Sequence, residues 1–159
     1  MPVKVVFLHG REGTPEGDKV RALRNMGYEV MAPSLDKNDW AVSVNQACDA
    51  IESFLPDVVV GSSRGGAVAM ATNTRRPMVL ICPAWQKNNP WSTCRADSVI
   101  LHARSDAVVP YADSARLAHA TGAALVVCGS DHRMNTPEAF AALHAAVERV
   151  RSDPMGDRV

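Results

Sequence analysis

Residues 58–66 read Val-Val-Val-Gly-Ser-Ser-Arg-Gly-Gly, an apolar run that leads into a serine flanked by glycines. Within this stretch, residues 61–65 match the pattern Gly-x-Ser-x-Gly, directly after the apolar run and before a segment that favours a helix. Because a glycine lies two residues away on each side of Ser63, the strand-to-helix turn can be sharp enough to lift its hydroxyl above a sheet. The spacing selects Ser63 rather than Ser62 as a candidate nucleophile.

Short apolar runs rich in β-branched residues recur on both sides of this motif. They predict strands that are covered on both faces, as in a parallel sheet, at 3–8, 28–31, 58–60, 78–82, 98–102 and 124–128. Helical start and stop signals between these runs predict about five helices, at 14–27, 39–55, from about 64 onward, at 110–120 and at 136–150. The alternation predicts an α/β fold, a single three-layer α/β/α sandwich with about six mainly parallel strands.

Two of these helices are expected to begin at the same signal. Thr14-Pro15-Glu16 and Thr136-Pro137-Glu138 each offer a threonine N-cap, a proline at the first helical position and an acid in the first turn. Gly27 supplies a stop for the first of the two helices.

The composition limits the partners to be expected. The chain has 159 residues, of which 47% are hydrophobic and 21% charged, with a formal net charge of +0. This length suits one domain, which we expect at 1–151, with a flexible tail at 152–159. Because no charge bias favours nucleic acid or a membrane surface, we expect a small-molecule partner and leave the oligomeric state open.

Cysteine usage and the start of the chain indicate the compartment. Cys48, Cys82, Cys94 and Cys128 are scattered without metal-ligand spacing, which predicts reduced packing residues and neither a metal nor another cofactor. The chain enters an apolar run at Val3 without a charged leader, and no run is long enough to span a bilayer. A cytoplasmic location is expected.

A nucleophilic serine needs a base and a carboxylate, supplied by loops at the carboxyl ends of later strands. Asp106 follows the expected strand 98–102, and His132 follows the expected strand 124–128. The chain order serine, aspartate, histidine is that of α/β-hydrolases. The weaker alternatives for the carboxylate are Asp97, Asp113 and Asp131.

These motifs resemble the α/β-hydrolase superfamily over nearly the whole chain, in particular its small esterases without a lid and its dienelactone-hydrolase-like members. His9-Gly10 is similar to the oxyanion loop of the family, Ser-Asp-Ala-Val-Val-Pro at 105–110 to its acid loop, and Asp131-His132 to its histidine loop. The family's two leading antiparallel strands have no counterpart, and 84–97 is too short for a cap domain. The resemblance therefore implies a minimal α/β-hydrolase fold without a cap.

Carried over to this chain, the resemblance implies Ser63 as nucleophile, His132 as general base and acid, and Asp106 as the orienting carboxylate. It also implies an oxyanion hole made by the backbone N–H groups of Arg11 and Arg64. The nucleophile position is serine, unlike that of dienelactone hydrolase, which disfavours that substrate.

Four aromatic and cationic positions near the motif leave the substrate open. Trp85, and with it Trp91, could wall an acyl pocket or simply cover the end of the sheet. The side chains of Arg11 and Arg64 could meet an acidic substrate or point to solvent. His9 is expected to shape the oxyanion loop by hydrogen bonding.

The function expected from these residues is that of a serine hydrolase of the carboxylesterase or acyl-hydrolase type. It would cleave a small ester, thioester or related acyl bond through an acyl-serine intermediate. A non-catalytic small-ligand-binding module on the same fold is the main alternative. Phosphate binding by residues 10–17 ranks last, because the loop lacks the lysine-hydroxyl pair of a P-loop.

Overall fold

The computed structural model describes residues 1–152, so the expected tail lies outside the described residues from residue 153 on. Strands and helices alternate strictly along these residues. In chain order the elements are β1 (Lys4–Leu8), α1 (Asp18–Asn25), β2 (Glu29–Met31), α2 (Trp40–Phe54), β3 (Val58–Ser62), α3 (Arg64–Ala71), β4 (Met78–Ile81), α4 (Trp85–Asn88), β5 (Val99–His102), α5 (Tyr111–Thr121), β6 (Ala124–Val127) and α6 (Pro137–Ser152).

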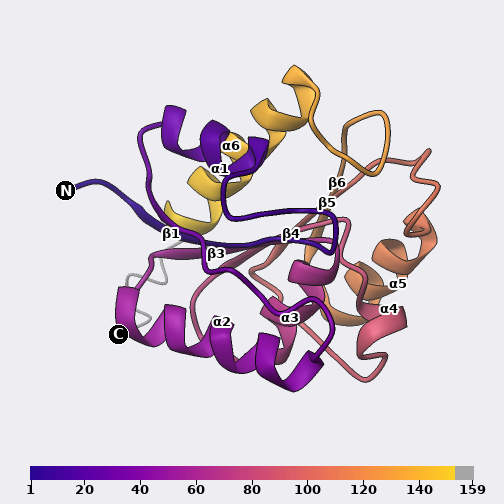
Figure 1. Ribbon diagram of the computed structural model, residues 1–159. Coiled ribbons are helices and arrows are strands. Elements are labelled where there is room, and N and C mark those ends of the chain that lie inside the picture. Colours follow the sequence, from indigo (N-terminus) through magenta and orange to yellow (C-terminus); the bar gives the residue numbers. More distant parts are fainter. Residues whose placement is uncertain (153–159) are drawn as a thin grey trace.

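The strands form one six-stranded sheet in the order β2-β1-β3-β4-β5-β6, and every neighbouring pair is parallel. Helices α1 and α6 cover one face of the sheet, and α2, α3 and α5 cover the other (Figure 1). The central strand β3 is buried along its whole length, as its continuous apolar sequence requires. The predicted three-layer α/β/α sandwich with six parallel strands is confirmed.

The strand order places a topological switch point beside β1. From β1 the chain moves outward to β2, then returns past β1 to add β3 on its other side. Right-handed crossovers put helices on opposite faces when the direction of winding reverses, which accounts for α1 and α2 lying on different sides of the sheet. The loops that follow β1 and β3 therefore face each other at the carboxyl edge, where open α/β sheets bind ligands.

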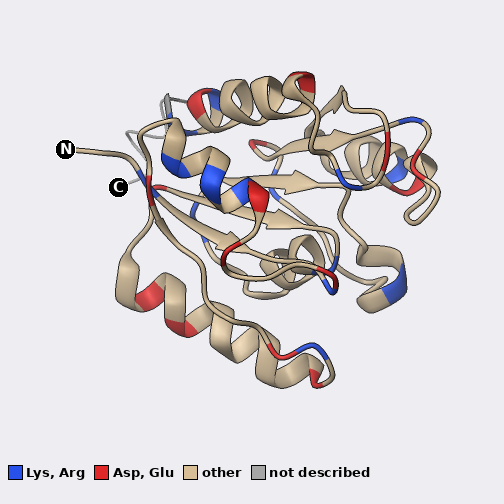
Figure 2. Ribbon diagram, turned by 45° about the horizontal axis from the view of Figure 1, so that its top comes forward, with Lys and Arg blue, Asp and Glu red and all other residues tan. Residues whose placement is uncertain are grey.

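Charged residues are spread over the surface rather than gathered in one region. Figure 2 shows basic and acidic positions interspersed along helices and loops, while the strands are almost free of both. Within residues 1–152, none of the helices combines the length and the apolar character that a bilayer crossing requires.

The two predicted helix starts have different outcomes. The start at residue 136 is confirmed, because Thr136 Oγ1 accepts a hydrogen bond from Ala139 N–H at 3.1 Å at the beginning of α6. The start at residue 14 is wrong, because α1 begins at Asp18. Thr14 instead accepts a hydrogen bond from Gly17 N–H at its carbonyl at 3.2 Å, so residues 14–17 form a turn before the helix.

Glycines allow α3 to pack directly on the sheet. A Cβ on Gly65 would collide with the carbonyl oxygen of Leu8 and lie 2.6 Å from that of His9. A Cβ on Gly61 would lie 2.5 Å from the carbonyl oxygen of Gly65. Both positions need glycine because backbone atoms, which cannot rotate away, occupy the space of a side chain.

We expect Gly65→Ala to lower the free energy of unfolding by about 3 kcal/mol, the upper end of the usual cost of overpacking, because the clash is with backbone. The matched control is Gly17→Ala, where the nearest atom to the new Cβ is Thr14 O at 3.4 Å. Gly17 is the N-cap of α1, where alanine is less favourable than glycine, so this control should cost at most about 1 kcal/mol. Urea unfolding measures both, and equal midpoints for the two variants would contradict this packing.

Candidate active site

Ser63 occupies a strained turn between β3 and α3. Its backbone φ is 56° and its ψ −118°, a conformation that residues other than glycine rarely adopt. Four backbone hydrogen bonds hold it there. Ser63 N–H donates to Ile81 O at 2.9 Å, and Ser63 O accepts from the N–H groups of Gly66 and Ala84, each at 3.0 Å, and of Ala67 at 3.3 Å. The predicted sharp turn is therefore present, and it presents the hydroxyl at the carboxyl edge of the sheet.

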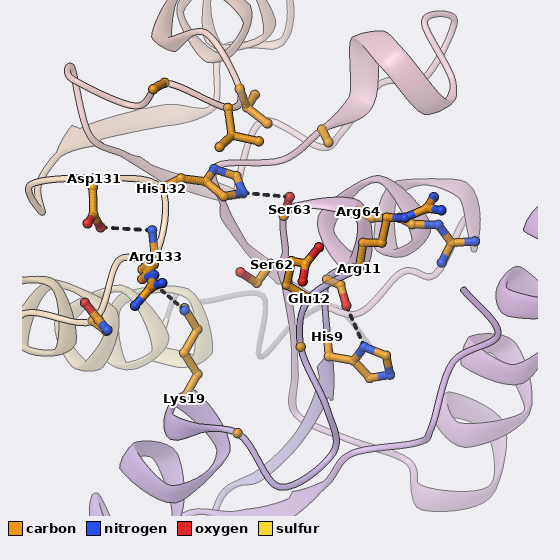
Figure 3. Close-up of a pocket in the computed structure, with 18 of the residues that line it drawn as sticks. His9, Arg11, Glu12, Lys19, Ser62, Ser63, Arg64, Asp131, His132 and Arg133 are labelled. Atoms are coloured by element: carbon orange, nitrogen blue, oxygen red, sulfur yellow. Dashed lines mark hydrogen bonds between the residues drawn. The ribbon is translucent and has the colours of Figure 1, made fainter. Parts of the chain in front are cut away.

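The three side chains selected from the sequence meet above this edge. His132 Nε2 lies 3.0 Å from Ser63 Oγ, and His132 Nδ1 lies 2.8 Å from Asp106 Oδ2. Figure 3 shows the imidazole turned toward the serine hydroxyl. Because the carboxylate can only accept, Nδ1 carries a hydrogen and Nε2 is left as the acceptor for the hydroxyl proton. This hydrogen-bonded chain can remove the proton of Ser63.

Asp106 is held by hydrogen bonds to both of its oxygens. Oδ1 accepts from the backbone N–H groups of Val108 and Val109, each at 2.8 Å, while Oδ2 accepts from His132. Burial would raise the pKa of this carboxyl, but the bonds from His132 and the two amides outweigh it, so its pKa lies below the ordinary value. Asp106 is therefore a charged acceptor beneath the imidazole.

A second histidine, His102, also contacts this carboxylate. His102 is completely buried at the end of β5, and its Nε2 lies 3.1 Å from Asp106 Oδ2 and 2.9 Å from Val109 O. Both neighbours are acceptors, so Nε2 carries a hydrogen. Its Nδ1 lies 2.6 Å from Ser114 Oγ on α5. The sequence signal was its position four residues before Asp106.

The lowered pKa of Asp106 predicts a pH dependence of stability. The native pKa lies below the unfolded value of about 3.9, so the unfolded state binds more protons at acidic pH. The contribution is present above the unfolded pKa and is lost as pH falls through the native pKa. We expect the unfolding free energy of Asp106→Asn to fall less steeply than that of the wild type from about pH 5 downward. Parallel profiles in urea titrations would contradict this.

The loop after β1 lies against the serine turn. A Cβ on Gly10 would lie 3.1 Å from Ser62 O and 3.2 Å from Ser63 Cβ, so glycine permits this approach. His9 fixes the loop, since its Nε2 accepts from Leu35 N–H at 2.9 Å and its Nδ1 donates to Gly10 O at 2.8 Å. Burial is the main cause of the lowered pKa of His9, which agrees with a neutral ring in this position.

The oxyanion hole predicted from the sequence uses the backbone N–H groups of Arg11 and Arg64. Arg64 is the first residue of α3, and the first N–H groups of a helix have no intrahelical acceptor. Arg11 follows Gly10 in the loop that abuts the turn, and both arginines line the pocket. The backbone arrangement is suitable for binding an oxyanion, and the assignment of the two donors stays a prediction.

Ser63 and His132 open into a cavity of about 1010 Å³ between the loops at the carboxyl edge. Trp85 does not line it, contrary to the expected role in substrate binding. Its indole is 8% exposed within the core and donates to Asp113 O at 3.2 Å, because the single turn of α4 directs it toward α5. Trp91 is 92% exposed and is also absent from the lining. Ala84, Lys87, Asn88 and Val108 contribute to this side of the cavity instead.

The alternative carboxylates have other partners. Asp97 pairs with Arg95 at 3.1 Å, Asp113 pairs with Arg116 at 2.7 Å, and Asp131 accepts from the backbone N–H of Arg133 at 3.0 Å. Of the aspartates weighed from the sequence, Asp106 is the one that the structure brings to His132.

A metal could be considered where Cys82, Asp106 and His132 bring ligand atoms within 4.8 Å of one another. Burial, and secondarily the charge of Asp106, raises the pKa of the Cys82 thiol to about 12. The sulfur is therefore protonated at neutral pH, and it contacts His132 O at 3.5 Å. Because metals bind the thiolate and His132 Nδ1 already donates to Asp106, these residues suit proton transfer better than metal binding.

No family model and no curated protein matches the chain. Solved structures do match. A protein of Xanthomonas campestris pv. campestris, described as belonging to the α/β superfamily of hydrolases, superposes with a TM-score of 0.74 at 23% identity, covering 95% of this chain and 96% of that chain. Est1E of Butyrivibrio proteoclasticus gives 0.73 at 15% identity, covering 92% and 86%. The Xanthomonas campestris protein XC6422, described as an α/β serine hydrolase without lid, gives 0.69 at 16% identity, covering 94% and 80%.

The chain has the α/β-hydrolase fold. At these identities the similarity concerns the fold, and the chemistry has to be argued from the side chains. In this α/β-hydrolase fold, the segment between β4 and β5 holds only the single turn α4, so it carries no cap domain over the cavity. The implied minimal, lidless form of the fold is confirmed.

Proposed function

We propose that this protein is a serine hydrolase that cleaves a small ester, thioester or related acyl bond through an acyl-serine intermediate. The observation that carries the proposal is the hydrogen-bonded chain from Ser63 Oγ through the imidazole of His132 to Asp106, with distances of 3.0 and 2.8 Å. These distances lie within the range in which a base can take a proton from a nucleophile. Ser63, His132 and Asp106 are thus proposed as a catalytic triad.

In this mechanism His132 Nε2 takes the hydroxyl proton as Ser63 Oγ attacks the acyl carbonyl carbon. The imidazolium is stabilised by Asp106, and it then protonates the leaving alcohol or thiol. Water, activated by the same imidazole, releases the acyl group as a carboxylic acid and restores Ser63. Each step moves one proton through His132, so no cofactor is needed.

The tetrahedral intermediate carries a negative oxygen, which backbone donors can stabilise. The N–H groups of Arg11 and Arg64 are proposed for this role, because their loop and helix start meet beside Ser63. Losing one such donor costs about 3 kcal/mol of transition-state stabilisation in comparable sites. The strain at Ser63 supports this arrangement, since it orients both the hydroxyl and the adjacent N–H.

A small acyl substrate as the partner and a cytoplasmic location remain parts of this proposal. The alternative is a ligand-binding module without catalysis. Such a module gives no reason for keeping a strained serine that is hydrogen-bonded to a histidine. Strain of this kind costs of order 1–3 kcal/mol and is retained chiefly at functional sites. The geometry therefore favours the enzyme.

The experiment that tests the proposal is a panel of p-nitrophenyl esters of increasing acyl length, run beside thioesters and lactones. We expect hydrolysis of at least one class by the wild type and none above background by Ser63→Ala. If no substrate class is turned over while a fitting ligand binds in the cavity, the binding-module alternative replaces the enzyme.

His102 is expected to act as a positioning residue through Asp106. His102→Asn removes the donor at the Nε2 position, and we expect kcat to fall about 10-fold with KM unchanged, since a hydrogen bond to a charged group is worth about 1.5–3 kcal/mol. His102→Gln, whose amide can reach Asp106, should recover part of the loss. The acidic limb of the pH–rate profile should also move in the Asn variant. A drop in stability with an unchanged kcat and pH profile would show a purely structural role.

A further inference from the structure

The side chain of Arg64 is a buried cation without a carboxylate partner. It is 8% exposed, and among residues 1–152 no carboxylate oxygen lies within 4.0 Å of its guanidinium. It rests over the ring of Trp40, 5.4 Å from the centroid, and donates from Nη2 to Ser43 Oγ at 3.2 Å. Because taking a charge out of water is costly without a counterion, this position is unusual for a residue that only fills space.

The environment of Arg64 fixes its direction. The hydroxyl of Ser43 donates to Trp40 O at 2.7 Å, so its lone pairs face the guanidinium. A guanidinium has five N–H groups, and Ser43 accepts from one nitrogen only. None of the nitrogens of Arg64 is both enclosed and without a hydrogen-bond partner, so the remaining donors are accessible. Arg64 is among the residues that line the cavity, whereas Trp40 and Ser43, which its guanidinium contacts, are not.

A second guanidinium lies in the same part of the cavity. Burial is the main cause of the lowered pKa of Arg64, and the positive charge of Arg11 adds to it, while Asp36 opposes it. Figure 3 shows the side chains of Arg11 and Arg64 on the side of Ser63 away from His132. Arg11 is exposed and, in the described part of the chain, forms no ion pair within 4.0 Å, even with its neighbour Glu12.

The local charge balance favours one negative charge on the ligand. Asp36 lies beyond 4.0 Å from Arg64, and its Oδ1 already accepts from the N–H groups of Asn38 and Asp39 at 2.8 and 2.7 Å. At the opposite side of the cavity, Lys19 Nζ donates to Arg133 O at 2.5 Å and forms an ion pair with Asp18 Oδ1 at 4.0 Å. In residues 1–152, Arg11 and Arg64 thus have no carboxylate within 4.0 Å on their side of Ser63, and Lys87 and Arg133, which line other parts of the cavity, have none either.

We propose that the side chains of Arg11 and Arg64 bind a carboxylate on the acyl part of the substrate. The inference rests on the proposed function, because the position of His132 defines where the leaving group lies. His132 protonates the leaving group, and the two arginines lie on the other side of Ser63. The substrate class is therefore a half-ester or half-thioester of a dicarboxylic acid, whose free carboxylate matches the planar donor fork of arginine.

The test compares the mono-p-nitrophenyl ester of adipic acid with p-nitrophenyl hexanoate, which has the same number of acyl carbons and no charge. We expect the wild type to prefer the charged ester by about 10- to 100-fold in kcat/KM, the range of charge-assisted hydrogen bonds. Arg11→Gln and Arg64→Gln should bring this ratio toward one. Arg11 is exposed, so its variant tests the inference even if the Arg64 variant is unstable.

Arg76→Gln is the matched control. Arg76 is exposed and precedes β4, at the amino edge of the sheet, so its loss should leave both the ratio and the rates unchanged. A second pair, 4-carboxyphenyl hexanoate and phenyl hexanoate, places the charge on the leaving group. Equal rates for this pair, after correction for spontaneous hydrolysis, are expected, and a preference here instead would overturn the acyl-side assignment.

The outcomes separate this inference from the function on which it rests. If the neutral ester is hydrolysed in a Ser63-dependent way and the acyl pair shows a ratio near one, the carboxylate site is wrong and the hydrolase stands. If neither ester is hydrolysed and the panel of esters, thioesters and lactones shows no turnover either, the proposed function fails. Calorimetric binding of monomethyl adipate and methyl hexanoate to the Ser63→Ala protein then still decides whether the arginines select a carboxylate.

Discussion

Replacing Ser63 with alanine is expected to reduce kcat for ester hydrolysis by about 10⁶-fold, as removal of the nucleophile does in comparable triads. The loss is large because Ser63 Oγ is the atom that forms the covalent bond. Within residues 1–152, no other hydroxyl is hydrogen-bonded to His132 Nε2. The backbone bonds that hold the turn do not involve the hydroxyl, so the fold should remain. Steady-state kinetics with the best ester of the panel, together with urea unfolding, measures both.

Ser62→Ala is the matched control for this variant. Ser62 precedes the nucleophile, lines the same cavity and is 8% exposed, yet no hydrogen bond links it to the imidazole. We expect its kcat to stay near that of the wild type. A Ser63→Ala protein that retained most of the activity, with Ser62→Ala inactive, would move the nucleophile by one residue and contradict the turn geometry.

The second large effect is expected for Asp106→Asn, with kcat reduced by about 10⁴-fold. The backbone N–H groups of Val108 and Val109 will hold the amide oxygen at the position of Oδ1. The amide nitrogen must then face His132 Nδ1 and the Nε2 hydrogen of His102, which places donor against donor. The imidazole can escape this only by moving its own hydrogen to Nε2, where it can no longer accept from Ser63.

Asp131→Asn separates this effect from a general loss of negative charge near the histidine. Asp131 is adjacent to His132 in sequence, but its carboxylate accepts from the N–H of Arg133 and does not contact the ring. We expect little change in kcat for this variant. If Asp131→Asn were as inactive as Asp106→Asn, the orienting carboxylate would have been assigned to the wrong loop.

Much of the fold could be predicted from the sequence because its signals are local. Apolar runs of three to six residues with β-branched side chains predict buried strands, and their alternation with helices predicts a mainly parallel sheet. The sequence signals of the candidate site are local as well. Gly61 and Gly65 permit the turn at Ser63, and Asp106 and His132 each follow a strand directly, so the carboxyl edge of a parallel sheet brings them together.

The errors and omissions concern contacts between segments that are far apart in the sequence. Trp85 looked suitable for a cavity wall, but the turn of α4 directs its ring toward α5, a packing that no local pattern reveals. The contact of His102 with Asp106 depends on how the acid loop folds back over β5. The sequence left open whether the side chain of Arg64 meets an acidic substrate or solvent, because its contacts with Ser43 and Trp40 come from α2.

The start of α1 illustrates a different limit. Thr14 does accept a hydrogen bond from Glu16 N–H at 3.3 Å, as a capping side chain would. The same threonine also closes a turn with Gly17, and the helix begins only after it. A local signal that suits both a turn and a cap does not distinguish them.

The most direct test of the proposed triad is labelling with a fluorophosphonate, followed by intact mass measurement and peptide mapping. We expect a single label on Ser63, formed slowly or not at all in His132→Gln, because the hydroxyl must lose its proton to the imidazole before it attacks phosphorus. A folded wild-type protein that remains unlabelled, or that carries the label on another residue while Ser63 stays unmodified, would contradict the assignment of Ser63 as the nucleophile.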